Sequence, residues 1–224
     1  MVKVRNLFVI LLLALVSQGL KAQDDVLKVG LRAGNNAAFG GFVATSLETN
    51  QTFGEEFSIH GGVQYSTIGR VALEARPAYA KNFAWGRLSA EVLLTYVHLT
   101  SINNMAVGGG VCVDYRWVDA TLGYYYRLYG GRGGWITEPF NIYYGARVHL
   151  LRENDAWDVT LAITNNEIFE LERHYQPSFI AECIYYPTNR LGISLGIGCK
   201  PAGMFHISAD YYQSYIKTGV CYRW

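Results

Sequence analysis

Hydrophobic and polar residues alternate with a period of two along most of this chain. From Leu191 to Gly198, leucine and isoleucine occupy every second position, and glycine or serine fills the positions between them. This period predicts β-strands with two different faces, because successive side chains of a strand point to opposite sides. Comparable runs lie within residues 57–65, 71–79, 105–115, 118–128, 140–148 and 157–163. Turn-forming residues separate the runs at short intervals, so we expect antiparallel hairpins from end to end.

The composition of the polar face indicates which side of the sheet points inward. An alternating sheet either buries its apolar face in a soluble core or turns that face toward lipid. Here the polar face mixes glycine, alanine and serine with charges of both signs, and the only lysines after residue 22 are Lys28, Lys81, Lys200 and Lys217. A soluble surface usually carries much more lysine and glutamate. We therefore predict an all-β, antiparallel, up-and-down transmembrane β-barrel. The opposite orientation would place Leu122, Ile142 and Leu195 together in a closed interior.

Charged residues of the polar phase predict an ion-paired network around a narrow lumen, where opposite charges must neutralise one another. The inward-facing Tyr125, Tyr143 and Tyr212 are expected to narrow this lumen further. The predicted lumen-facing network consists of Glu74, Arg76, Glu91, Asp114, Arg116, Arg127, Arg147, Glu182, Asp210 and Lys217.

The N-terminal segment has the pattern of a cleaved secretory signal peptide covering residues 1–22. Lys3 and Arg5 precede an unbroken apolar run from Leu7 to Val16, and Ala22 occupies the expected cleavage position. The run is too short for a helical membrane anchor, which needs about 18–20 apolar residues. Residues 23–224 then form a single barrel domain.

The last strand alternates up to an aromatic terminal residue. Ile216, Thr218, Val220, Tyr222 and Trp224 share one phase. With the signal peptide and the hairpin array, this pattern resembles the outer-membrane β-barrel proteins of Gram-negative bacteria, and the short barrel is similar to those of Bacteroidota-type envelopes. The resemblance implies that the five residues form an assembly signal read by the barrel-assembly machinery, and that outer-membrane lipid surrounds the protein.

The number of strands is less clear from the pattern than the fold class. About thirteen strand-like runs are visible, whereas a single-chain bacterial barrel has an even number. We expect about twelve strands, within a range of 8–14, with residues 26–33 or one of the tight turns as the surplus run. Only the connections at residues 49–55 and 130–139 look long. Residues 167–185 read as one extended strand, whose first half would project beyond the membrane as a solvated hairpin tip or a docking surface.

Length and charge exclude several classes of protein. The 224 residues suit one domain, and the 50% hydrophobic content excludes a disordered chain. The 19 basic residues nearly balance the 18 acidic residues, so the chain lacks the basic excess typical of proteins that bind nucleic acid.

Candidate catalytic and metal-binding motifs are scarce. Cys112, Cys183, Cys199 and Cys221 show no CxxC spacing, and we expect them to be free thiols. The histidines are scattered, so no metal or other cofactor is predicted. His206 and Ser208 resemble part of the arrangement used by outer-membrane lipid A deacylases. However, both share the lumen phase, and Ala209 replaces the asparagine of that family.

The sequence leaves two main hypotheses for function. A crowded, charge-paired lumen with mostly short loops suits an integral barrel with a structural or partner-subunit role beside another envelope protein. The alternative is a narrow diffusion channel for small polar solutes, which is motivated by the arginines and carboxylates that face one another in the lumen. A lipid-modifying enzyme and a soluble lipocalin-like binder are weaker alternatives, and we expect no enzymatic activity.

Overall fold

The computed structural model describes residues 26–37, 40–131, 133–151, 156–167, 170–171, 177–201 and 212–224. The predicted signal peptide, residues 1–22, lies outside the described residues. Within the described ranges, no helix is long and apolar enough to cross a membrane. The strands are β1 (Val26–Asn36), β2 (Gly40–Phe53), β3 (Phe57–Ser66), β4 (Arg70–Phe83), β5 (Gly86–Leu99), β6 (Ile102–Tyr115), β7 (Val118–Gly131), β8 (Gly134–His149), β9 (Trp157–Thr164), β10 (Asn166–Glu167), β11 (Glu170–Leu171), β12 (Ser178–Tyr185), β13 (Leu191–Lys200) and β14 (Gln213–Arg223).

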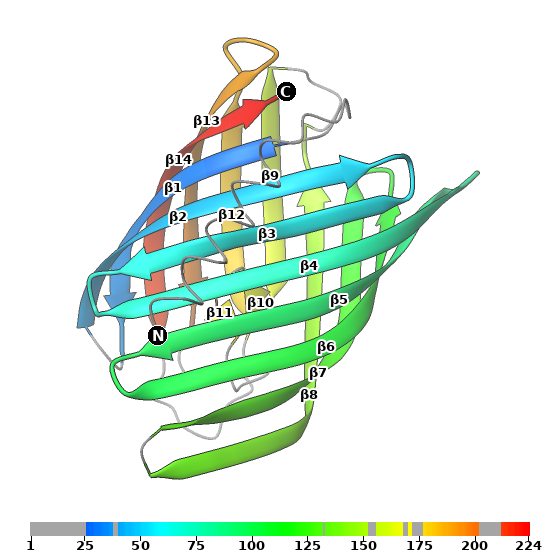
Figure 1. The fold of residues 1–224 in the computed structure, drawn as a ribbon. Coiled ribbons are helices and arrows are strands. Elements are labelled where there is room, and N and C mark those ends of the chain that lie inside the picture. Colours follow the sequence, from blue (N-terminus) through cyan, green and yellow to red (C-terminus); the bar gives the residue numbers. More distant parts are fainter. Residues whose placement is uncertain are drawn as a thin grey trace.

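Twelve of these strands form a closed antiparallel barrel, which confirms the predicted fold class (Figure 1). The order around the wall is β1-β14-β13-β12-β9-β8-β7-β6-β5-β4-β3-β2, and β1 pairs with both β2 and β14. The suggestion that residues 26–33 are a surplus run is wrong, because they belong to β1. The pairing of β1 with β14 closes the barrel. The ring of strand pairings is complete, although β9 pairs only with Gly145–His149 of the longer β8.

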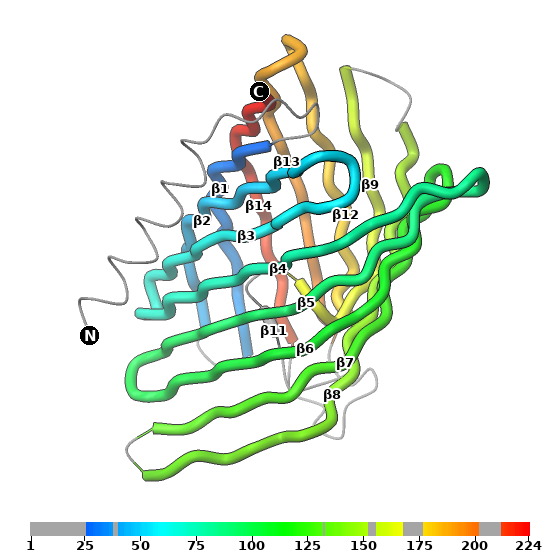
Figure 2. The backbone as a smooth tube through the Cα atoms, turned by 45° about the vertical axis from the view of Figure 1, so that its right-hand side comes forward, coloured from blue at the N-terminus to red at the C-terminus, as the bar shows by residue number. Residues whose placement is uncertain are grey.

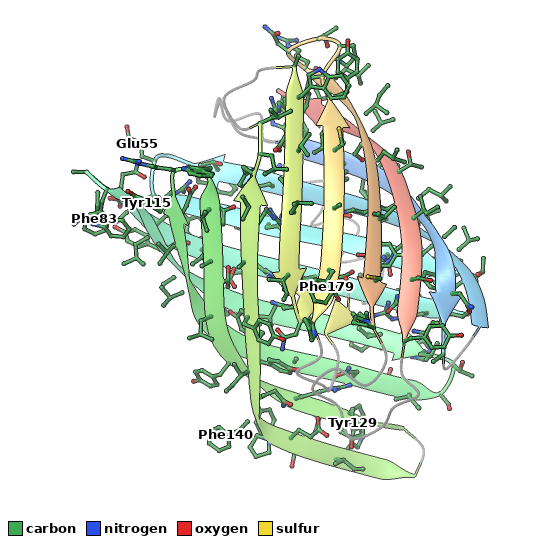
Figure 3. All side chains as sticks on the ribbon, turned by 180° about the vertical axis from the view of Figure 1, so that it is seen from behind. Glu55, Phe83, Tyr115, Tyr129, Phe140 and Phe179 are labelled. Atoms are coloured by element: carbon green, nitrogen blue, oxygen red, sulfur yellow. The ribbon has the colours of Figure 1, made fainter. Side chains whose placement is uncertain are left out.

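The apolar face of the wall points outward. Leu122, Ile142 and Leu195 are 64%, 48% and 60% exposed, so they do not meet in a closed interior. Tyr143, which follows Ile142, and Ser194, which precedes Leu195, are buried on the opposite face. Figure 3 shows side chains such as Phe140 standing away from the barrel wall. An outward apolar face and an inward polar face is the arrangement of a transmembrane barrel.

The barrel has two different ends. Val26 pairs with Arg223, so both described chain ends lie at one end, here called the terminal end, together with the tight turns at residues 54–56, 84–85 and 116–117. The opposite end, here called the loop end, carries the connections β9–β12 and β13–β14. Figure 2 shows the strong tilt of β3 to β8 around the wall.

Two connections that looked long are tight turns in the structure. Residues 49–53 continue β2 and pair with β3 as far as Phe57, and residues 134–139 belong to β8 and pair with β7. Polar residues in the first segment and glycines in the second obscure the alternation. The pairing of Gly131 with Gly134 leaves a compact turn at the tip of the second hairpin.

The prediction of one long strand over residues 167–185 is also wrong. The wall strand β12 begins only at Ser178, and the short pair β10–β11 precedes it as a separate two-stranded sheet. Figures 1 and 2 both show this pair within the outline of the barrel wall. Asn166 and Glu167 therefore do not project beyond the membrane as a tip.

The closing strand generates a prediction about assembly. Trp224 packs against Tyr222 with ring centroids 6.0 Å apart, whereas Trp135 is half exposed near the tip of the β7–β8 hairpin. We expect Trp224→Ala to lower the amount of folded protein several-fold, because it removes the aromatic side chain that follows β14 and ends the predicted assembly signal. Trp135→Ala is the matched control. Heat-modifiable mobility in gel electrophoresis measures the folded fraction, and equal levels of the two variants would contradict the assembly signal.

Candidate functional site: the lumen

The candidate site is the inner wall of the barrel, where polar and charged side chains from most strands converge. The structure places Glu74, Arg76, Glu91, Asp114, Arg127, Arg147, Glu182 and Lys217 on the inward phase of their strands, and Asp210 lies outside the described residues. Arg116 does not belong to the lumen. It lies in the β6–β7 turn with φ 54° and its guanidinium is 5.3 Å from the Tyr115 ring, because the turn ends the strand alternation at Tyr115.

One ion cluster joins β1, β12 and β14. The Glu182 carboxylate accepts hydrogen bonds from Lys28 and from Lys217, the latter at 2.6 Å. Strand β13 lies between β12 and β14, and its Gly196 is opposite both Glu182 and Lys217. A Cβ at Gly196 would lie 2.6 Å from Lys217 Cε, so the glycine leaves the space through which the lysine reaches Glu182. The shared carboxylate pairs with both ammonium groups, and the three residues together carry one excess positive charge.

A second row crosses four strands on the other side of the barrel. The register aligns Tyr143, Gly123, Gly110 and Glu91 on β8, β7, β6 and β5. The Tyr143 ring lies across the two glycines, is fully buried, and donates a hydrogen bond of 2.9 Å from its hydroxyl to Glu91. The glycines are therefore required by a close side-chain approach and not by backbone conformation.

Arg76 and Glu74 form an ion pair on β4, beside this row. Arg76 Nε donates to Glu74, whose side chain is almost completely buried. The Arg76 side chain also donates a 3.0 Å hydrogen bond to Asn166 Oδ1. The second contact comes from the β9–β12 connection, so Arg76 joins the wall to a segment inside the lumen.

This inner segment, Asn165–Glu167, is anchored at separate points around the wall. Asn165 bonds β8, where its side chain donates to Ile142 O and accepts from Tyr144 N at 2.9 and 2.7 Å. Glu167 accepts hydrogen bonds from Arg32 of β1 at 3.0 Å and from the Tyr215 hydroxyl of β14 at 2.9 Å.

The anchor points lie far apart in the strand order. The path along the wall from β8 to β4 passes β7, β6 and β5, and the path from β9 to β1 passes β12, β13 and β14. Because the same three residues reach β8, β4 and the β14–β1 pair, the segment crosses the lumen.

The loop end and the terminal end carry smaller polar clusters. Near the loop end, Arg127 donates to Asn104 at 3.0 Å and lies 3.7 Å from Glu138. Near the terminal end, His149 stands between Asp119 and Asp158, at 2.8 and 3.4 Å.

Beyond β12, Tyr186 lies under the guanidinium of the C-terminal Arg223, 3.6 Å from its ring centroid. Burial raises the pKa of Tyr186, although the charge of Arg223 opposes the shift.

Arg147 differs from the other arginines of the lumen. It has the same strand phase as Tyr143 and pairs in register with Asp119 and Ala162, yet its side chain is exposed. Because Arg147 is exposed on the inner phase, solvent-accessible space lies inside the wall near the end of β8.

The sequence pattern missed several residues that organise the lumen. Lys28 and Arg32 were overlooked because residues 26–33 were suspected to lie outside the barrel, although Val29 and Leu31 alternate with them. The pattern places Glu167 in a projecting strand and does not single out Asn166. The signal that favours an inward fold is the polar run Thr164–Glu167 directly after an apolar strand face.

Other chemistry is sparse in the part of the chain that the structure describes. No group of three or more histidine, cysteine, aspartate or glutamate residues there is arranged to hold a metal ion. The four cysteines are free thiols, with Cys199 exposed and Cys221 buried. His206 and Ser208 lie outside the described residues, so their proximity to a carboxylate is not defined.

Comparisons with solved structures identify the architecture. The KdgM porin matches with a TM-score of 0.57 and 12% identity, over 89% of this chain and 99% of that one. The NanC porin matches with a TM-score of 0.56 and 12% identity, over 89% and 100%. The translocator domain of the autotransporter NalP from Neisseria meningitidis matches with a TM-score of 0.52 and 12% identity, over 100% and 97%. No protein-family model matches the sequence, and no curated protein matches it. The chain therefore has the fold of porin-like outer-membrane barrels.

The glycine row under Tyr143 predicts a matched pair of variants. A Cβ at Gly110 would lie 2.3 Å from the Tyr143 hydroxyl, whereas the nearest atom to a Cβ at Gly109 is the Glu91 carbonyl oxygen at 3.3 Å. We expect Gly110→Ala to lower the free energy of unfolding by about 1–3 kcal/mol, the usual cost of overpacking. Gly109→Ala should cost clearly less. Denaturant titration of the refolded barrel in lipid measures both, and a larger loss for Gly109→Ala would contradict the described row.

Proposed function

We propose that this protein is a narrow diffusion channel for small polar solutes in the outer membrane. The observation that carries the proposal is the exposed Arg147 on the inner phase of a closed barrel, because it indicates an aqueous space inside a wall whose outer face is apolar. A polar, hydrated interior behind a lipid-facing surface is the usual construction of a porin.

Two features support a narrow passage for small solutes. A barrel of twelve strands is wider than one of eight, whose interior side chains fill completely. Here the buried Tyr125 and Tyr143 and the inner segment Asn165–Glu167 occupy part of that extra space. The remaining room suits small molecules better than polymers.

The structural neighbours favour the same class of function. Two of them are porins, and the KdgM porin is also described in complex with disordered oligogalacturonate. At 12% identity the likeness supports a shared architecture and does not extend that polyanion to this chain. The lumen here pairs basic residues with acidic ones, as in Arg76 with Glu74 and Arg32 with Glu167, so we propose solutes without a strong net charge.

The competing hypothesis is a structural or partner-subunit barrel without transport. This hypothesis is supported by the side chains that bond across the interior, where Tyr143 and Glu74 are almost fully buried. The two hypotheses differ in one measurable property, since a braced but sealed barrel conducts no ions. A soluble lipocalin-like binder would be released from membranes by carbonate without detergent, whereas an integral barrel would not.

The channel hypothesis predicts ohmic single-channel steps in planar bilayers. Arg147→Gln removes a water-exposed positive charge from the lumen, so we expect the reversal potential in a salt gradient to shift toward cation preference, by roughly a twofold change in permeability ratio. Arg116→Gln is the matched control, because Arg116 lies in a turn outside the lumen. Silence of the folded protein at all salt concentrations would contradict the channel, and equal shifts in both variants would contradict the role of Arg147.

A further inference from the structure

We propose, building on the channel function above, that Asn166 and Glu167 form the constriction of this channel and that Glu167 sets its charge selectivity. Both residues are buried inside the barrel and belong to the connection between β9 and β12, not to the wall. A solute that passes through the lumen must pass beside them, because the segment reaches from β8 to β4 and to the β14–β1 pair.

The two groups that bind the Glu167 carboxylate, the Arg32 guanidinium and the Tyr215 hydroxyl, are held in place by other contacts. The Arg32 guanidinium stacks 3.4 Å from the centroid of the Tyr215 ring, and both groups donate to the same carboxylate oxygen. Tyr215 lies directly over Gly198, where a Cβ would come within 2.1 Å of its ring, and Gly34 leaves room on the other side. Strands β1 and β14 therefore hold the guanidinium and the hydroxyl in position to bind the Glu167 carboxylate.

Asn166 has a different role, because it carries no charge. Its Oδ1 accepts from Arg76, and the other hydrogen bond of that guanidinium goes to Glu74. The amide thus ties the segment to β4 and takes up space in the lumen. Its removal is expected to widen the passage while the charge of the constriction stays the same.

Two ion pairs meet at the constriction, Arg32 with Glu167 and Arg76 with Glu74. Arg32 and Arg76 are positive, and Glu74 and Glu167 are negative. Neutralising Glu167 leaves an excess positive charge close to the ion path, whereas neutralising Arg32 leaves an excess negative charge. In a water-filled passage one such charge changes ion permeability ratios by roughly twofold to threefold.

The experiment is the single-channel conductance and reversal potential of the full-length mature protein in planar bilayers under a potassium chloride gradient. We expect Glu167→Gln to raise the anion-to-cation permeability ratio, Arg32→Gln to lower it, and the double variant Arg32→Gln/Glu167→Gln to return it to the native value. Asn166→Ala should raise the conductance without moving the reversal potential. Glu56→Gln, in the exposed β2–β3 turn, is the control for loss of a carboxylate elsewhere.

Folding is checked by heat-modifiable mobility before any recording. If loss of Glu167 alone prevents folding, the double variant removes both charges of the pair, and Asn166→Asp adds a negative charge at the same place and should shift selectivity toward cations. Conducting Glu167→Gln channels with native selectivity, or an Asn166→Asp variant without a shift, would overturn this inference while leaving the channel intact. A folded native protein that never conducts would overturn the channel function as well.

Discussion

Barrel closure with the apolar face outward is the constraint on which the rest of this structure depends. Once Leu122, Ile142 and Leu195 face lipid, every charged residue of the opposite phase is confined to the lumen. A confined charge is costly unless it is paired or hydrated. The ion clusters, the row of Tyr143 and Glu91, and the contacts of the inner segment all follow from that confinement.

Glycine determines how these side chains share the interior. Tyr143 over Gly110 and Gly123, and Tyr215 over Gly198, are two instances of one arrangement, in which an aromatic ring lies over a neighbouring strand position that lacks a side chain. The same principle lets Lys217 pass Gly196 to reach Glu182. Large polar groups can therefore extend sideways along the wall and reach partners several strands away, and the lumen is narrowed without being packed like a soluble core.

The sequence pattern was sufficient for the fold but not for the inner segment Asn165–Glu167. Strict alternation in runs such as Leu191–Gly198 identifies the phase and the outward face, and these predictions agree with the structure. Alternation cannot show that a polar connection turns inward, because the partners of Glu167 are more than a hundred residues away at Arg32 and about fifty at Tyr215. The prediction that Arg116 faces the lumen is wrong for a related reason. In the sequence the polar phase continues to Arg116, but in the structure β6 ends at Tyr115 and a turn follows.

The most direct test of this account is the lipid accessibility of nitroxide labels on β7 and β13, attached to cysteines at positions 122 and 195 and, for comparison, at position 121, in a variant without the four native cysteines. We expect strong collisions with membrane-dissolved oxygen at 122 and 195 and weak collisions at 121, where Thr121 faces the lumen. Labels at 122 and 195 that are shielded from oxygen and immobilised in a packed interior would contradict it.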